Sequence, residues 1–235
     1  MRKYDPVEEM SLLLKARLED WRLLNKGPAY QCKPLVTVTR EPGSGGESIA
    51  EKIAAELGMH LYNWELVERI ARDASVDAQL VSKLEEDPAT VFDDYLGDLV
   101  SEYKREYRFS SEKYLDSLKR VLLAIAVPGN AVIVGRGSNF FLPQDNKIGL
   151  CLVAPLSVRI ENVTKELGLT DKEARKHISK LEAEHRKLAK KYFQADVRDP
   201  DNYHLVVNTT LIKPETIVQM VRLLIQESNE AKQET

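Results

Sequence analysis

Hydrophobic residues follow two different periods in the segment between positions 35 and 62. Residues 35–39 form a short apolar, β-branched run that is typical of a buried strand. After a glycine-rich turn, apolar residues recur at helical spacing over 49–57, and Gly58 follows as a stop signal. Another short strand is predicted at 60–62. The pattern therefore predicts a strand, a turn, a helix and a second strand in close succession.

The same alternation continues in the second half of the chain. Further strands are predicted at 131–134, 148–153 and 203–207, and further helices at 155–167, 171–193 and 214–226, before a polar tail at 227–235 that we expect to fray. A capping box, Thr170-Asp171-Lys172-Glu173, marks the start of the longest of these helices. Strands that alternate with helices indicate an α/β fold of three layers, with a mostly parallel five-stranded sheet covered on both faces.

Two helical segments lie outside this alternation. Residues 1–30 contain an amphipathic helix that begins at Asp5-Pro6 and ends at Gly27-Pro28. We expect this N-terminal extension to pack on the core or on a second subunit, and the alternative is a helix that binds a membrane surface or a partner protein. A second block, 75–128, shows only helical patterns. We expect it to be an insertion in the domain at 31–235, lying over a site.

Composition narrows the class of protein. The 235 residues are 43% hydrophobic and 30% charged, as in an ordinary globular protein, and the net charge of −3 argues against a dedicated nucleic-acid binder. Cys32 and Cys151 are the only cysteines, which indicates neither a disulfide framework nor a zinc site. The N-terminal residues lack the continuous apolar run of a secretory signal. We therefore expect a cytoplasmic protein that binds neither nucleic acid nor membranes.

The turn after the first strand carries the most informative residues: it reads Arg40-Glu41-Pro42-Gly43-Ser44-Gly45-Gly46-Glu47-Ser48. Glycines between a strand and a helix let backbone N–H groups and the positive helix end approach a phosphate. In the full P-loop pattern a lysine follows the last glycine, but Glu47 stands there instead. Ser48 remains a candidate Mg²⁺ ligand, and Arg40 could supply the missing positive charge. The alternative is an ordinary glycine-rich connection between a strand and a helix.

A second glycine-rich turn, Gly135-Arg136-Gly137, follows the strand predicted at 131–134. This position places the Arg136 guanidinium at the carboxyl edge of the sheet, where open α/β folds bind their ligands. An arginine can donate two parallel hydrogen bonds to one phosphate. The alternative is a surface arginine in a turn.

The long helix at 171–193 is rich in lysine and arginine. Most of these side chains are expected to form a solvated face. Arg186 and, after the helix, Arg198 are kept as candidate contacts to a transferred phosphoryl group.

These segments together resemble the cytidylate-kinase-like family of P-loop nucleoside monophosphate kinases. The resemblance lies in five short blocks: Thr39 to Gly46, Tyr62-Asn63, Val132 to Gly137, Ala154 to Ile160 and Tyr203 to Thr209. Their order and spacing cover most of the chain beyond the N-terminal extension.

The resemblance implies a P-loop NTPase-type fold and transfer of the γ-phosphoryl group of ATP, with Mg²⁺, to a nucleoside monophosphate such as CMP or dCMP. It assigns the ATP phosphates to Arg40, Gly43, Ser44, Gly45, Gly46, Glu47 and Ser48, with Ser48 also touching the metal. It assigns the acceptor to Tyr62, Asn63 and Arg136, and the charge of the moving phosphoryl group to Arg159 and Arg186. These two arginines would come from a mobile lid. Residues 168–200 would form a lid-like helical region, and the insertion at 75–128 would cover the acceptor base.

Three positions depart from the pattern of cytidylate kinases, which carry a P-loop lysine, an acidic residue before Gly-Arg and an aspartate after the second strand. Here these positions hold Glu47, Val134 and Asn63. The alternative is therefore a catalytically weak or inactive relative that binds nucleotide and has a regulatory or interaction role. Its N-terminal helix would then mediate a homodimer or bind a partner protein. A third hypothesis is that the protein is a kinase that phosphorylates another small acceptor.

Overall fold

The computed structural model of the chain describes residues 33–63, 118–119, 121–123, 125–126, 128–135, 137–142 and 147–231. The chain divides into two compact units, and the unit formed by residues 33–63 and 130–235 contains all the described strands. The predicted N-terminal extension, most of the insertion at 75–128 and Arg136 lie outside the described residues. Within those residues, no helix is both long enough and apolar enough to span a membrane.

The strands form one five-stranded sheet in the order β2-β3-β1-β4-β5. Their bounds are β1 Leu35–Arg40, β2 His60–Tyr62, β3 Ala131–Val134, β4 Lys147–Val153 and β5 Leu205–Asn208. Every neighbouring pair is parallel, and the central strand β1 pairs with β3 on one side and β4 on the other. This confirms the predicted parallel sheet. Because all five strands run the same way, their carboxyl ends meet at one edge, which is where the glycine loop begins.

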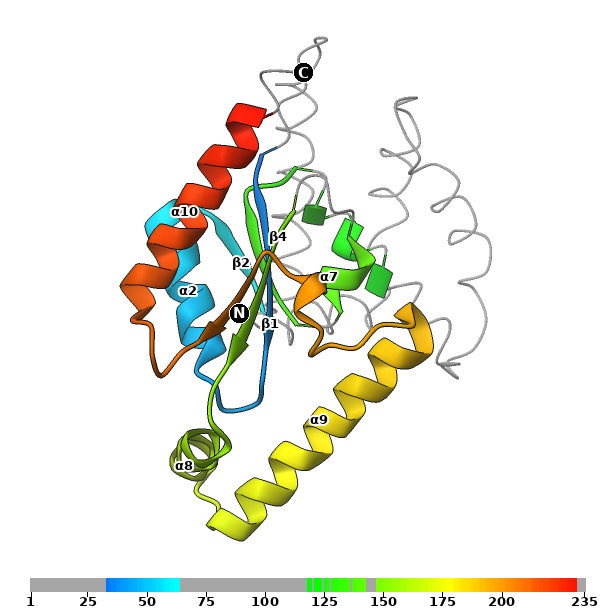
Figure 1. Ribbon diagram of the computed structural model, residues 1–235, viewed down its shortest axis with the longest axis vertical. Coiled ribbons are helices and arrows are strands. Elements are labelled where there is room, and N and C mark those ends of the chain that lie inside the picture. The colour runs from blue at the N-terminus through cyan, green and yellow to red at the C-terminus, as the bar shows by residue number, and fades with distance from the viewer. Residues whose placement is uncertain are drawn as a thin grey trace, which may run out of the picture. The chain divides into compact units, whose positions relative to one another are not determined.

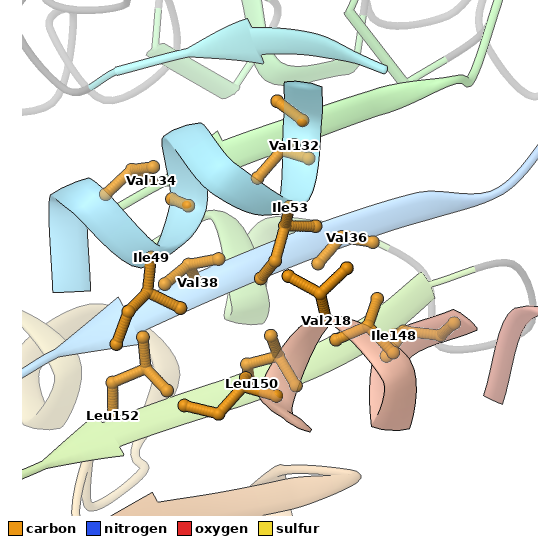
Figure 2. Packing of buried hydrophobic residues seen from close by; sticks show 14 of the residues in the cluster. Val36, Val38, Ile49, Ile53, Val132, Val134, Ile148, Leu150, Leu152 and Val218 are labelled. Carbon is orange, nitrogen blue, oxygen red and sulfur yellow. The ribbon is translucent and has the colours of Figure 1, made fainter. Parts of the chain in front are cut away.

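Two helices, α2 (Gly46–Leu57) and α10 (Pro214–Ala231), cover one face of this sheet (Figure 1). Their apolar side chains pack on the alternate residues of β1 and β4 that point to that face. Figure 2 shows Ile49 and Ile53 of α2 and Val218 of α10 beside Val36 and Leu150 of the strands. All five side chains are at most 3% exposed, so this dry interface is the main core of the unit.

The opposite face, which is covered by the short helix α7 (Ser138–Phe141), is partly polar at its centre. The Thr37 hydroxyl donates to Asn139 Oδ1 at 3.0 Å, and Asn139 Nδ2 donates to the Asn202 carbonyl at 2.9 Å. A side chain at Gly149 would place its Cβ 2.5 Å from Asn139 Oδ1, so glycine leaves the space that this amide fills. Helices on both faces complete the three layers that the sequence predicts.

Helices α8 (Leu156–Leu167) and α9 (Asp171–Phe193) form a hairpin beyond the carboxyl ends of the strands (Figure 1). Thr170 caps α9 through the predicted capping box with Glu173. A small apolar cluster of Ile160, Val163, Ala174 and Ile178 joins the two helices. The hairpin therefore has a core of its own in addition to the main one.

The structure corrects some of the sequence-based boundaries and adds one helix. Strand β5 begins at Leu205 and not at residue 203, because the Tyr203 N–H closes a 3-10 turn by donating to the Pro200 carbonyl. Helix α10 continues to Ala231, so the prediction of a frayed tail from residue 227 was wrong over its first five residues. Helix α7 was not predicted, since four residues are too few to show a helical period.

Lys147 provides a test of this fold through the pH dependence of its stability. Its side chain is 2% exposed and its Nζ donates to the carbonyls of Asn139 and Leu142. Burial lowers the pKa of Lys147 to about 8, from about 10.4 in an unfolded chain. Between these values the unfolded state binds more protons, so this residue makes the free energy of unfolding increase with pH, by at most about 1.4 kcal/mol per pH unit.

The measurement is urea unfolding at pH values from 7 to 10 for the wild type and for Lys147→Met. Burial also raises the pKa of Cys151 to about 11, which has the opposite effect in this range, so the difference between the two proteins is the informative quantity. We expect the wild type to gain stability relative to the variant above pH 8. A difference that is flat with pH would contradict the buried position of the ammonium group.

Candidate functional site

The loop between β1 and α2 leaves the N-terminus of α2 without a side-chain cap. Gly45 occupies the N-cap position with φ +74°, and no side chain accepts a hydrogen bond there. The Ile49 N–H donates to the Gly45 carbonyl at 3.3 Å, but within the described part of the chain the amides of Gly46, Glu47 and Ser48 have no backbone partner. Free amides at a helix N-terminus form a natural anion site, which is the geometry that a phosphate requires.

Close packing explains the glycines of this loop. A Cβ at Gly43 would lie 2.5 Å from the carbonyl oxygen of Arg159 and 3.0 Å from Val163 Cγ2. A Cβ at Gly46 would lie 2.5 Å from the Cβ of Arg40. At Gly45 nothing lies within 4 Å of such a Cβ, so the loop is tightly enclosed at two glycines and open at the third.

Two hydrogen bonds from distant segments and one within the loop hold its carbonyl groups. Asn162 Nδ2 donates to the Gly43 carbonyl at 2.8 Å, and the Thr209 hydroxyl donates to the Ser44 carbonyl at 2.7 Å. Within the loop, the Ser44 N–H donates to the Glu41 carbonyl at 3.0 Å. Because these carbonyls are bound on one side, the amide N–H groups at the start of α2 are left to face the open side.

Glu47, which stands in the place of the P-loop lysine, is paired with Arg40. Arg40 Nη2 lies 2.8 Å from Glu47 Oε1, and the Arg40 side chain is 16% exposed against 53% for Glu47. An ion pair this exposed contributes little to stability, on the order of 1 kcal/mol or less. The pair does place the Arg40 guanidinium against the Glu47 carboxylate, so Glu47 does not present an unpaired negative charge beside the free amides.

Arg159, expected from the resemblance on a mobile lid, is buried at the base of α8. Its Nε lies 3.3 Å from Glu41 Oε2 and donates to the Ala154 carbonyl at 3.0 Å, while its Nη1 lies 2.8 Å from Glu182 Oε1. Only 6% of the residue is exposed. The same Glu41 oxygen accepts from the Ala154 N–H at 3.2 Å. This guanidinium is therefore enclosed by protein groups and does not face the open side of the loop.

The other predicted site residues that the structure describes lie at the same edge of the sheet, at the start of α2 or on the hairpin. Tyr62 is 1% exposed at the end of β2, and Asn63 follows it in a partly exposed position. Gly135 donates its N–H to the Val38 carbonyl at 2.9 Å, which fixes the residue before Arg136, and Arg136 itself lies outside the described residues. Arg186 is exposed on α9, four residues beyond Glu182. The Ser48 hydroxyl donates to the Gly45 carbonyl at 3.0 Å.

Sequence reasoning missed the residues that hold the loop in place, namely Glu41, Asn162, Glu182 and Thr209. Glu41 offered a signal, because it stands where the P-loop pattern has its first glycine. The other three contact the loop or its partners from positions far away in the chain, and no local pattern distinguishes them from other polar residues.

Comparison with known proteins gives a consistent result. A sequence model of the cytidylate kinase-like family matches residues 35–211, from β1 through β5. The cytidylate kinase of Pyrococcus horikoshii is 28% identical over 194 residues, which are 82% of this chain and 88% of that protein. The cytidylate kinase of Methanopyrus kandleri is 29% identical over 182 residues, 77% of this chain and 87% of that protein.

A solved structure shares the fold. An uncharacterized protein from Eubacterium ventriosum superposes with a TM-score of 0.55 at 18% identity, over 83% of this chain and 99% of that one. The likeness supports the arrangement of sheet and helices and nothing about chemistry.

Alanine at two loop glycines should have different effects on stability. Gly45→Ala meets open space, so only the strain of positive φ applies, about 1 kcal/mol. Gly43→Ala adds a clash with the backbone of α8 to the same strain, so we expect a loss above about 2 kcal/mol. Gly168→Ala, with φ +65° and open surroundings outside the loop, is the matched control. Urea unfolding measures all three, and equal losses would contradict the close approach of α8 to Gly43.

Proposed function

The chain belongs to the cytidylate kinase-like family, and from this premise we propose that it transfers the γ-phosphoryl group of ATP to a pyrimidine nucleoside monophosphate, CMP or dCMP. The observation that carries the proposal is the uncapped N-terminus of α2, with the free amides of Gly46, Glu47 and Ser48 at the carboxyl edge of a parallel sheet. Relatives named cytidylate kinase along most of the chain support the choice of acceptor.

In this proposal the loop from Gly43 to Ser48 holds the ATP phosphates through its backbone. The positive end of α2 adds to the amides, and together they supply charge stabilisation without a lysine. Arg40 lies beside the loop and would offset phosphate charge if Glu47 gave up its contact. Backbone donors are fixed in place before the nucleotide arrives, which is the property that electrostatic stabilisation needs.

Mg²⁺ fits the same loop through Ser48. Its hydroxyl uses its proton on the Gly45 carbonyl, which leaves the oxygen lone pairs for a cation. Among the described residues there is no group of three or more His, Cys, Asp or Glu side chains that could hold a metal. The ion would therefore be held by Ser48, by water and by the phosphates, as is usual for Mg²⁺ with nucleotides. When bound, it offsets negative charge on the phosphate oxygens.

The acceptor is assigned to the neighbouring strand ends. Asn63 follows β2 and Arg136 follows β3, and these parallel strands are adjacent at the carboxyl edge. We assign the acceptor phosphate to Arg136 and the nucleoside to the side of Asn63, with Tyr62 supporting that strand end from its buried position. Arg186 on α9 is assigned to the charge of the moving phosphoryl group. Such a reaction needs positioning and charge more than acid–base groups.

The alternative is a relative that binds nucleotide without useful turnover and acts in regulation. Glu47, Val134 and Asn63 favour it, since each departs from the pattern of active cytidylate kinases. Loss of one charge-stabilising donor costs about 3 kcal/mol of barrier, or roughly a hundredfold in rate. We also propose a cytoplasmic location, from the composition of the chain. From the amphipathic pattern of residues 1–30, we propose that this segment forms a homodimer or binds a partner protein.

The direct test is ADP release from Mg·ATP in the presence of CMP, dCMP, UMP or AMP. We expect turnover with CMP and dCMP, and we expect Arg136→Ala to lower kcat/KM by about a hundredfold, because the acceptor phosphate loses its charged partner. Arg222→Ala on α10 is the matched control and should leave the rate unchanged. Nucleotide binding in calorimetry without turnover would favour the regulatory alternative. Absence of any nucleotide binding would contradict both.

The Glu47 position provides a second test that needs no turnover. Glu47→Lys should raise the affinity for Mg·ATP about tenfold, because it replaces a negative charge near the phosphates by a positive one. Glu51→Lys makes the same change of charge one turn further along α2, on an exposed side, and should have a much smaller effect. Equal gains for the two variants would show that position 47 does not face the phosphates.

A further inference from the structure

Arg159 is held between two carboxylates that come from distant parts of the chain. Glu41 belongs to the glycine loop at the end of β1, whereas Glu182 lies in the middle of α9. The guanidinium reaches Glu41 at 3.3 Å through Nε and Glu182 at 2.8 Å through Nη1. The side chains of Arg159, Glu41 and Glu182 are 7%, 22% and 16% exposed, so little solvent screens either pair.

An arginine in this position is not free to follow a phosphoryl group. If its guanidinium left, Glu41 would lose its positive partner, Glu182 would keep only Arg198, and the Ala154 carbonyl would lose a donor. Breaking a buried ion pair by removing one partner is strongly unfavourable. The arrangement is therefore that of a permanent structural contact.

The face of α8 that carries Arg159 also touches the glycine loop directly. Arg159, Asn162 and Val163 lie three and four residues apart, which puts them on one side of the helix. Asn162 donates to the Gly43 carbonyl, and both Val163 and the Arg159 carbonyl approach the position of a Cβ on Gly43 within 3.0 Å. Any movement of this face must therefore change the surroundings of Gly43.

The contact continues through α9 to the segment that follows it. Glu182 uses Oε1 for Arg159 and Oε2 for Arg198, whose Nη2 lies 3.1 Å away. From its position on α9, Glu182 thus contacts both the base of α8, through Arg159, and the segment after α9, through Arg198. One row of alternating charges runs from the glycine loop across the hairpin.

We propose that Arg159 is a positioning residue of the glycine loop: its pairs with Glu41 and Glu182 hold α8 against Gly43 and so keep the amides of the loop in the shape that binds phosphate. Arg159 does not touch the transferred group in this account. The effect of Arg159 on ATP binding rests on the proposed function, but the position of α8 against Gly43 is a property of the protein without any ligand. The two can therefore fail separately.

The test uses Glu41→Gln and Glu182→Gln, each of which removes one charge next to Arg159 and keeps the size of the side chain. Glu215→Gln is the matched control, because it removes the same charge from the Lys52 pair that joins α2 to α10 away from the loop. The first readout is amide hydrogen exchange of Ser44 and Ile49, whose N–H groups donate to the Glu41 and Gly45 carbonyls of the loop, in the full chain without ligand. We expect exchange there to become at least fivefold faster in the first two variants and to stay unchanged in the control.

The second readout separates positioning from direct contact with the reacting group. With Mg·ATP and CMP, we expect both variants to raise KM for ATP about tenfold while kcat and KM for CMP stay within twofold. Arg159→Lys, which keeps the charge, should retain more of the wild-type affinity for ATP than Arg159→Met. This order is expected because Lys can still pair with at least one of the two carboxylates.

Two results would overturn the proposal. One is unchanged exchange of the Ser44 and Ile49 amides in both Glu41→Gln and Glu182→Gln. The other is a large loss of kcat in Arg159→Lys with unchanged loop exchange and unchanged KM for ATP, which would place the guanidinium on the moving phosphoryl group. If the wild type has no kinase activity, the proposed function fails, while the exchange measurement still decides whether Arg159 positions the loop. Glu182→Asp serves the same purpose if Glu182→Gln does not fold.

Discussion

Two glycines with no room for a side chain determine the shape of the carboxyl edge of this sheet. Gly43 lies against the backbone of α8 and Gly46 lies against the stem of Arg40, each with a Cβ position only 2.5 Å from a neighbouring atom. This close approach brings the end of β1 and the start of α2 together without a capping side chain. The free amides of α2 are thus a consequence of backbone packing, and the parallel sheet supplies the edge at which they are useful.

The same packing explains how a loop with two glutamates can offer an anion site. Each glutamate has an arginine of its own: Glu41 pairs with Arg159, and Glu47 pairs with Arg40. The two pairs differ in kind, because the first is mostly buried and the second is half exposed at its acidic end. Only the second can exchange its partner for a phosphate at low cost, since solvent already screens it. The buried pair holds the shape of the loop, and the exposed pair neutralises the charge of Glu47.

Local patterns predicted the elements well and the contacts between them poorly. The strands at 60–62 and 131–134 were predicted to the residue, and Thr170 marked the start of α9. Gly58 ends α2 shortly before the first strand, and Asn130 and Gly135 bound the apolar run of the second. The predicted role of Arg159 on a lid came from a motif, and a motif cannot show which carboxylates surround a side chain once the chain has folded. Glu182 lies 23 residues from Arg159 and Thr209 lies 165 residues from Ser44, so these contacts depend on the tertiary fold.

Helix α9 connects the two sides of the proposed site. Near its middle, Glu182 holds Arg159 beside the glycine loop, and at its end the ring of Phe193 stacks on Phe140 at 5.2 Å. The same ring lies 3.1 Å from the position of a Cβ on Gly137, in the turn that carries the proposed acceptor arginine. From Glu182 to Phe193 the helix spans about 16 Å. In the proposed reaction the donor and acceptor phosphates must stand in line, and a helix packed beside both turns limits how far those turns can move apart. Movement of α9 as a rigid body away from either turn would break one of these two contacts, so α9 holds both turns in place.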